Sequence, residues 1–176
     1  MQIALVMTVI GPDRPGIVEK VARLVAEHGG NWLESRMCRL GGEFAGILRI
    51  QLPSNAESKL VIELCKLQAE QLSVVVRPDQ AEVPLTPERS VALEVVGHDR
   101  PGIVRAITAV LTRHLVNVEE LETERASAPM SGEPLFRAKA LLKLPESCNL
   151  EVLRGDLEKA AEDLTVEVTV AEEQRA

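Results

Sequence analysis

Two short segments hold the residues of this chain that are best suited to binding a small anion. Residues 11–18 read GPDRPGIV, and the same pattern returns 86 positions later, where residues 97–104 read GHDRPGIV. Each segment follows an apolar run and opens a helical pattern, so each is expected to be a loop from a strand into a helix. The unpaired N–H groups at a helix start, with the positive end of the dipole, suit a carboxylate or a small phosphate.

Glycine and asparagine residues recur at matching positions in the two copies. Gly16 and Gly102 carry no side chain, so a ligand could come close to the backbone there. Asn31 and Asn117 each begin the strand after the first helix, and that strand is expected to lie beside the first one, near the loop. An amide both donates and accepts hydrogen bonds, which suits a zwitterion.

Each of these residues also has a purely structural interpretation. Pro-Gly can simply start a helix that Asp13 and Asp99 cap. The asparagines can be turn residues at a helix exit. His28 and His114 fall in the last turn of their helices, where a cation complements the dipole. Both interpretations stay open for the loops and the asparagines.

The sequence contains no recognisable motif for enzyme or cofactor chemistry. There is no phosphate-binding Walker loop, no nucleophile elbow and no zinc-binding helix, so no catalytic residue, metal or cofactor is expected. The three cysteines are widely spaced and form no C-x-x-C pair. Cys38, Cys65 and Cys148 are expected to be free thiols in a reducing cytoplasm.

Composition excludes several classes of partner. The formal net charge of −7 and the aromatic content of 2% disfavour both a phosphate-backbone site and base stacking, so no direct contact with nucleic acid is expected. The N-terminus lacks a basic region before its apolar run, so we expect no signal peptide. No apolar run reaches the ~18 residues of a membrane span.

The first half of the chain predicts six elements. Gln2–Ile10 is expected to be a strand buried on both faces, and a helix opens at Pro15, ending at Gly29-Gly30. A hairpin of residues 31–40 and 44–52 turns at Gly41-Gly42. A second helix and a strand at 72–76 complete a β-α-β-β-α-β order.

The second half repeats that order from residue 91. The predicted domains are residues 1–80 and 88–171, joined by a proline-containing linker at 81–87 and followed by a frayed tail at 172–176. The second hairpin is about six residues longer, and its extra segment at 126–132 is expected to be a mobile tip. The fold class is therefore α+β, with two ferredoxin-like modules expected to pack as an intramolecular pseudo-dimer. A further homo-oligomer stays open.

This order, with D-R-P-G-I at the first junction and Asn about fifteen residues later, resembles the ACT domain family of regulatory modules. The resemblance covers nearly the whole chain, twice. A stand-alone tandem is similar to the transcriptional repressors of the glycine cleavage system. The resemblance implies a non-enzymatic regulator that binds a small amino acid, such as glycine, and controls a partner protein such as a transcription factor of glycine cleavage or one-carbon metabolism.

In that family, ligands commonly sit where the first strand–helix loop of one module meets a neighbouring module. Carried over, the resemblance implies two sets of ligand-binding residues. They are Asp13, Arg14, Pro15, Gly16, Ile17 and Asn31, and Asp99, Arg100, Pro101, Gly102, Ile103 and Asn117.

The copies differ, so two equal sites do not follow. Pro12 becomes His98, and the Gly29-Gly30-Asn31 pattern survives only in the first copy, which favours that copy. Two alternatives remain. One is an interaction module that needs no ligand. The other is a regulatory relative of formyltetrahydrofolate deformylase, whose N-terminal ACT segment the D-R-P-G-I-V and G-G-N patterns also resemble, without its catalytic domain.

Overall fold

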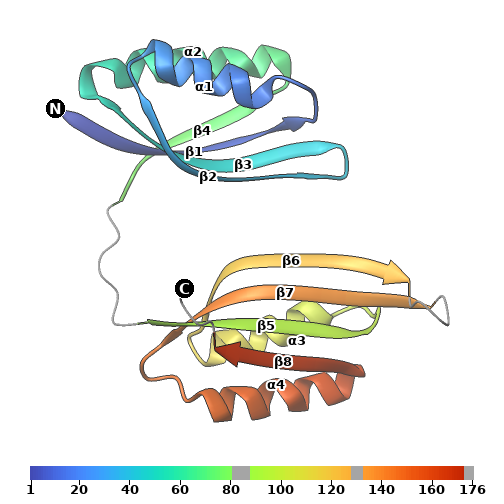
Figure 1. The fold of residues 1–176 in the computed structure, drawn as a ribbon. Coiled ribbons are helices and arrows are strands. Elements are labelled where there is room, and N and C mark those ends of the chain that lie inside the picture. The colour runs from blue at the N-terminus through green and yellow to red at the C-terminus, as the bar shows by residue number, and fades with distance from the viewer. Residues whose placement is uncertain (81–87, 128–132, 173–176) are drawn as a thin grey trace. The chain divides into compact units, whose positions relative to one another are not determined.

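The chain divides into two compact units, Met1–Glu82 (module 1) and Val83–Ala176 (module 2). The computed structural model describes residues 1–80, 88–127 and 133–172 (Figure 1). The predicted linker at 81–87, residues 128–132 of the predicted mobile tip and residues 173–176 of the predicted tail lie outside the described residues. The prediction that the modules pack on each other stays a prediction.

Module 1 has the predicted order of strands and helices. Its elements are β1 (Gln2–Pro12), α1 (Ile17–Glu27), β2 (Asn31–Leu40), β3 (Glu43–Pro53), α2 (Glu57–Lys66) and β4 (Ser73–Pro78), with short 3-10 helices at Ser54–Ala56 and Leu67–Glu70.

Module 2 repeats the order with a longer hairpin. Its elements are β5 (Glu88–His98), α3 (Ile103–Arg113), β6 (Asn117–Ser127), β7 (Pro134–Pro145), α4 (Leu150–Leu164) and β8 (Val166–Glu172).

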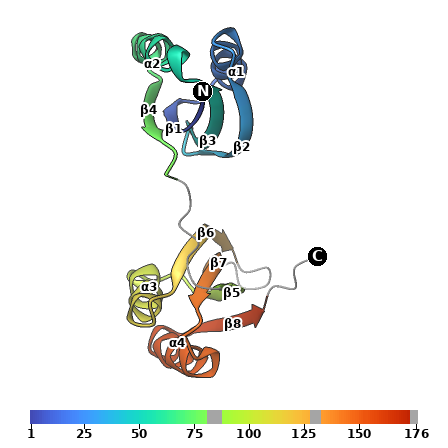
Figure 2. The same ribbon diagram turned by 90° about the vertical axis from the view of Figure 1, so that its left-hand side faces the viewer.

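Each module is one antiparallel four-stranded sheet with both helices on one face. The strand orders are β2-β3-β1-β4 and β6-β7-β5-β8, and Figures 1 and 2 show α1 with α2, and α3 with α4, on a single side of their sheets. This is the predicted α+β fold class. Two aliphatic clusters, one per module, fill the space between helices and sheet.

Three details differ from the sequence-based expectation. The first strand is buried on one face only, because residues such as Leu5 and Met7 alternate with the exposed Thr8 and Ile10. The first helices begin at Ile17 and Ile103, two residues later than predicted. The expectation that the second strand neighbours the first is wrong, since β3 lies between β1 and β2, and β7 between β5 and β6.

Candidate functional site

The helix starts after the two repeated segments lack a side-chain cap. Gly16 and Gly102 occupy the N-cap positions of α1 and α3 in the left-handed region, with φ of 94° and 97°. Neither helix start has a side-chain hydrogen bond, whereas Asn149 caps α4 by accepting from the N–H groups of Glu151 and Val152. The first N–H groups of α1 and α3 therefore keep their capacity to donate to an anion.

Both glycines are required by their backbone angle rather than by crowding. A Cβ at Gly16 or Gly102 would meet no atom within 4 Å. The left-handed conformation costs other residues roughly 1–2 kcal/mol. The space above each helix start is thus open, as the sequence suggested.

The repeated aspartates do not cap the helices, which corrects the structural interpretation of them. Asp13 Oδ2 lies 2.6 Å from Arg39 Nε, and Asp99 Oδ2 lies 2.9 Å from Arg125 Nε. The Asp13 N–H also donates to the Gly42 carbonyl at 2.9 Å. Each aspartate thereby fastens its loop to the end of the neighbouring hairpin.

The sequence reading missed the two arginines in these pairs. Arg39 and Arg125 are related by the same offset of 86 as the aspartates they bind. The repeat offset could have identified these arginines. They were missed because they lie outside the repeated octapeptide.

The first glycine of each segment allows a close approach to the backbone that faces it. A Cβ at Gly11 would lie 2.3 Å from the Gln71 carbonyl oxygen, and one at Gly97 would lie 2.6 Å from the Val166 Cα. Real Cβ atoms do not come this close to backbone. Gly11 and Gly97 therefore serve the fold and not a ligand.

The loop arginine of module 1 is held by a carboxylate. Arg14 Nη2 donates to the Glu70 carbonyl oxygen at 2.8 Å, and its guanidinium also pairs with the Glu70 carboxylate at 3.3 Å. Lys20 Nζ binds the same carboxylate. The hydrogen bond from Lys20 is the main cause that holds the pKa of Glu70 below its ordinary value. Burial opposes it, and the charges of Lys20 and Arg14 lower the pKa further.

The loop of module 2 lacks this cluster. Ala106 stands where module 1 has Lys20. Within the part of the chain that the structure describes, Arg100 forms no ion pair or hydrogen bond. The same loop backbone thus presents an arginine that a carboxylate engages in module 1 and, within the described residues, an arginine without such a partner in module 2.

The remaining predicted residues fall into two groups. Pro15 and Pro101 are exposed in the turn before each helix, while Ile17 and Ile103 are buried, so these isoleucines could offer a ligand bound at the loop only their backbone. These positions share one loop in each module.

The asparagines do not join the loop of their own module. Asn31 pairs with Gln51, which pairs with Ala4, whereas the loop leaves β1 at Pro12. At about 3.4 Å per residue, eight residues separate the two ends of β1 by about 27 Å. Because Asn117 holds the same place in module 2, neither asparagine lies near the loop that it was expected to complete.

The two histidines terminate helices, in keeping with their structural interpretation. His28 Nδ1 lies 2.8 Å from the Leu24 carbonyl oxygen, and His114 Nε2 lies 2.8 Å from Asp156 Oδ2. The hydrogen bond that Asp156 accepts from His114 lowers the pKa of Asp156. All three cysteines are free. Among the described residues, no group of His, Cys, Asp and Glu could hold a metal, and no helix is long and apolar enough to cross a membrane.

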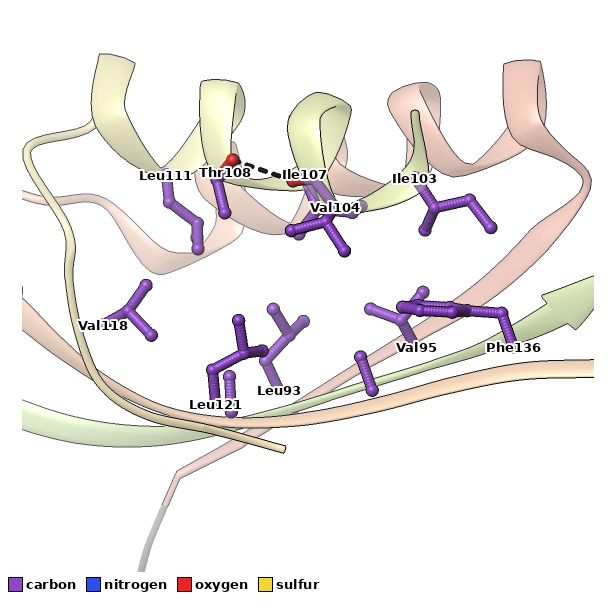
Figure 3. A pocket seen from close by; sticks show the side chains of 12 residues that line it. Leu93, Val95, Ile103, Val104, Ile107, Thr108, Leu111, Val118, Leu121 and Phe136 are labelled. Atoms are coloured by element: carbon purple, nitrogen blue, oxygen red, sulfur yellow. Dashed lines mark hydrogen bonds between the residues drawn. The ribbon is translucent and has the colours of Figure 1, made fainter. Parts of the chain in front are cut away.

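Module 2 contains an apolar hollow between α3 and its sheet (Figure 3). The space in it that admits the centre of a water molecule is about 30 Å³. Ile103, Ile107 and Leu111 line it from above, and Val118 and Phe136 from below. Of the predicted ligand-binding residues, Ile103 alone lies in its lining.

The hollow reflects a difference in side-chain volume between the modules. Val118 and Ala140 in module 2 stand where module 1 has Trp32 and Leu48. Both of those larger side chains pack into the core of module 1. The lining is apolar, and the Thr108 hydroxyl already donates to the Val104 carbonyl oxygen at 2.8 Å. The lining residues include no charged group that could pair with an ammonium or a carboxylate.

Comparison with known proteins finds the same family in both modules. The ACT domain model matches residues 4–77 and 90–171. The glycine cleavage system transcriptional repressor of Escherichia coli (strain K12) is 35% identical over 134 residues, which are 70% of this chain and 69% of that protein. These likenesses support a regulatory role.

Solved structures extend the likeness over nearly the whole chain. A crystal structure of an unknown protein from Galdieria sulphuraria is 30% identical, with a TM-score of 0.87 over 99% of this chain and 100% of that one. A provisionally assigned glycine cleavage system transcriptional repressor is 22% identical, with a TM-score of 0.72 over 99% of each chain, and it shows the shared fold.

Proposed function

The chain belongs to the ACT domain family, and from this premise we propose that it is a non-enzymatic regulator that binds a small amino acid and controls a partner protein by contact. The observation that carries the proposal is the pair of uncapped helix starts behind Gly16 and Gly102. The ligand carboxylate would accept hydrogen bonds from these N–H groups. The dipole alone contributes only about 0.3–1 kcal/mol, so a side chain must add to it.

Arg100 is the side chain best placed to add that affinity. It lies in the loop before α3, and within the described residues no carboxylate neutralises it. Arg14 is already engaged by Glu70. We therefore assign the stronger carboxylate site to module 2, although the sequence favoured the first copy on its Gly-Gly-Asn pattern.

Glycine is the first ligand to test, and a transcription factor of glycine cleavage or one-carbon metabolism is the proposed partner. The similarity to the E. coli repressor supports both choices. The three free cysteines are in keeping with a reducing cytoplasm as the place of action. Coupling between ligand and partner of this kind is typically about 1–3 kcal/mol.

Calorimetric titration of the full chain with glycine, serine and larger amino acids tests the proposal. We expect saturable binding that Gly102→Leu abolishes, because leucine fills the open space and strains the left-handed position. Gly16→Leu is the matched control, since it imposes the same strain in module 1. Unfolding curves of both variants show whether each module still folds. Equal binding by the wild type and by Gly102→Leu would contradict the assignment.

A ligand-independent interaction module is the second candidate. One observation favours it: Gly11 and Asp13, with their counterparts in module 2, already have structural roles. Under this alternative no amino acid produces heat or raises the unfolding temperature. A partner would then bind with the same affinity in the presence and absence of amino acids.

A further inference from the structure

The sheet of module 1 exposes an apolar patch on the face that its helices leave uncovered. Leu5, Met7 and Val9 of β1 point to the helices, so the alternate residues of the sheet point to the other side. Three large side chains of this open face are about half exposed: Ile10 at 47%, Ile47 at 55% and Val75 at 50%.

The strand register places these side chains next to one another. Thr8 lies between Ile47 on β3 and Val75 on β4, and Ile10 lies beside Ala45. Small and apolar residues thus form the middle of the face across three strands. Contiguous exposed apolar surface of this kind marks an interaction site more often than isolated apolar residues do.

Three of these positions are charged in module 2, whereas Val96 and Thr169 stand where module 1 has Ile10 and Val75. Lys139 replaces Ile47, Arg137 replaces Ala45 and Glu94 replaces Thr8. The two sheets are built alike, so the apolar centre of module 1 is not a requirement of the fold. This difference between two similar sheets makes the open face of module 1 a surface to consider for binding.

We propose that the open face of module 1 binds the open face of module 1 in a second copy of this chain. A two-fold axis parallel to the strands, between β1 and β3, places each β2 over β4 of the second copy. Such an interface is self-complementary, as two-fold dimers require. The two sheets stack about 10 Å apart with their apolar middles in contact.

Charge complementarity at the rim selects this arrangement. Glu34 on β2 and Arg77 on β4 lie at the two ends of one row of paired residues across the sheet. The row runs from Glu34 to Arg49 on β3, Val6 on β1 and Arg77. They are three strand spacings apart, about 14 Å, which is too far for an ion pair within one module. Within the described residues neither has an ion-pair partner. The proposed axis brings each Glu34 over Arg77 of the second copy, twice per dimer.

Other arrangements lose this match. A two-fold axis perpendicular to the strands would place Arg36 over Arg36 of the second copy, so that like charges would face each other. The parallel axis instead sets Arg36 over Val75 and Ile47 over Thr8 of the second copy. In module 2 the equivalent operation would oppose Glu124 to Glu167, so the charged face does not pair with itself.

Analytical ultracentrifugation of the full chain across the micromolar range tests the proposal. We expect a reversible dimer with twice the chain mass of 19.2 kDa. Ile47→Lys, which installs the residue type found in module 2, abolishes the dimer because it buries a charge in the apolar centre. Glu34→Arg and Arg77→Glu each weaken it about tenfold by opposing like charges.

The double variant Glu34→Arg with Arg77→Glu restores the ion pair between the copies with the two charges exchanged. We expect its dimer affinity to be close to that of the wild type. Glu122→Arg on the open face of module 2 is the control and leaves the dimer unchanged. Far-UV circular dichroism confirms that each variant is folded. The proposal is overturned by a monomer at every concentration, by a dimer that survives Ile47→Lys, or by a double variant as weak as the single ones.

Discussion

In module 1 the loop arginine is tied to Glu70, whereas its counterpart in module 2, Arg100, forms no ion pair within the described residues. The backbones of the two loops are nearly identical, with φ of 94° at Gly16 and 97° at Gly102. The copies therefore keep the features that shape the loop and differ in whether a carboxylate already engages the loop arginine.

The space beneath the first helix differs between the modules in the same way. Trp32 and Leu48 pack into the core of module 1, and Val118 and Ala140 leave a hollow in module 2. Neither difference alters the strand order or the helix positions. A residue that both copies share is therefore explained first by a structural role. The positions at which the copies differ are where a specific function should be sought.

The largest expected effect concerns the first glycine of each loop. Gly11→Ala and Gly97→Ala each force a Cβ into backbone atoms of the facing strand or turn, so we expect a loss of about 3 kcal/mol or more of unfolding free energy. Urea unfolding measures it. Trp32 is the sole tryptophan, so its fluorescence reports module 1 and should respond to Gly11→Ala more than to Gly97→Ala. Tolerance of either alanine would contradict the structural role.

The next prediction exchanges the packing beneath the helices. Trp32→Val makes a cavity in module 1 like the one in module 2, and should lower the unfolding free energy by about 2 kcal/mol. Val118→Trp fills existing space and should change it by about 1 kcal/mol or less. Circular dichroism during urea unfolding compares the two. A loss at Val118→Trp as large as that at Trp32→Val would show that the hollow is not available space.

The third prediction uses the acid dependence of the Glu70 cluster. The folded pKa of Glu70 lies below its ordinary value of 4.5, chiefly through the hydrogen bond from Lys20. The resulting stabilisation is present above about pH 4.5 and is lost as the pH falls through the lower folded pKa. Glu70→Gln should therefore make the unfolding free energy of module 1 depend less on pH in the acid range. Trp32 fluorescence reports the unfolding of module 1.

Asp156→Asn is the matched control in module 2, where the hydrogen bond from His114 likewise lowers the pKa of Asp156. It should leave the Trp32 signal unchanged at every pH. If the unfolding free energy of module 1 depends on acid pH in the same way in Glu70→Gln as in the wild type, the cluster does not stabilise module 1.

The smallest expected effect lies at the helix exits. Gly29 takes a φ of 69°, and its counterpart Leu115 takes 56° while 77% exposed. Leu115→Gly should relieve about 1–2 kcal/mol of backbone strain against about 0.5–1 kcal/mol of added chain entropy. We expect a small net gain in unfolding free energy by urea titration. A loss would show that the exposed leucine makes a stabilising contact.

The fold could be predicted because periodicity and the repeat determine it. The alternating strands, the Gly41-Gly42 turn and the helical stripes are local signals, and the 86-residue offset supplied each element twice. The strand beside β1 was mispredicted because order in a sheet depends on pairing between distant segments. Burial of β1 on one face also depends on the helices lying together on one side, which no local pattern reveals.

The candidate site was predictable only in part. The repeat located the loops and Gly16 and Gly102, whose left-handed backbone the structure contains. It could not reveal that Glu70, some fifty residues away in the chain, binds Arg14 and Lys20. It placed Asn31 near the loop because the strand order was mistaken. Contacts between residues far apart in the chain therefore account for most of what the sequence did not disclose.

The most direct test of the difference between the loops is titration of glycine, and of the tightest other amino acid found, into Arg100→Ala and Arg14→Ala. If the available arginine of module 2 holds the carboxylate, Arg100→Ala weakens binding about tenfold or more, as expected for loss of a charge-assisted hydrogen bond. Arg14→Ala leaves it nearly unchanged, because Glu70 already occupies that side chain. The reverse order of effects, or equal effects, would contradict the account.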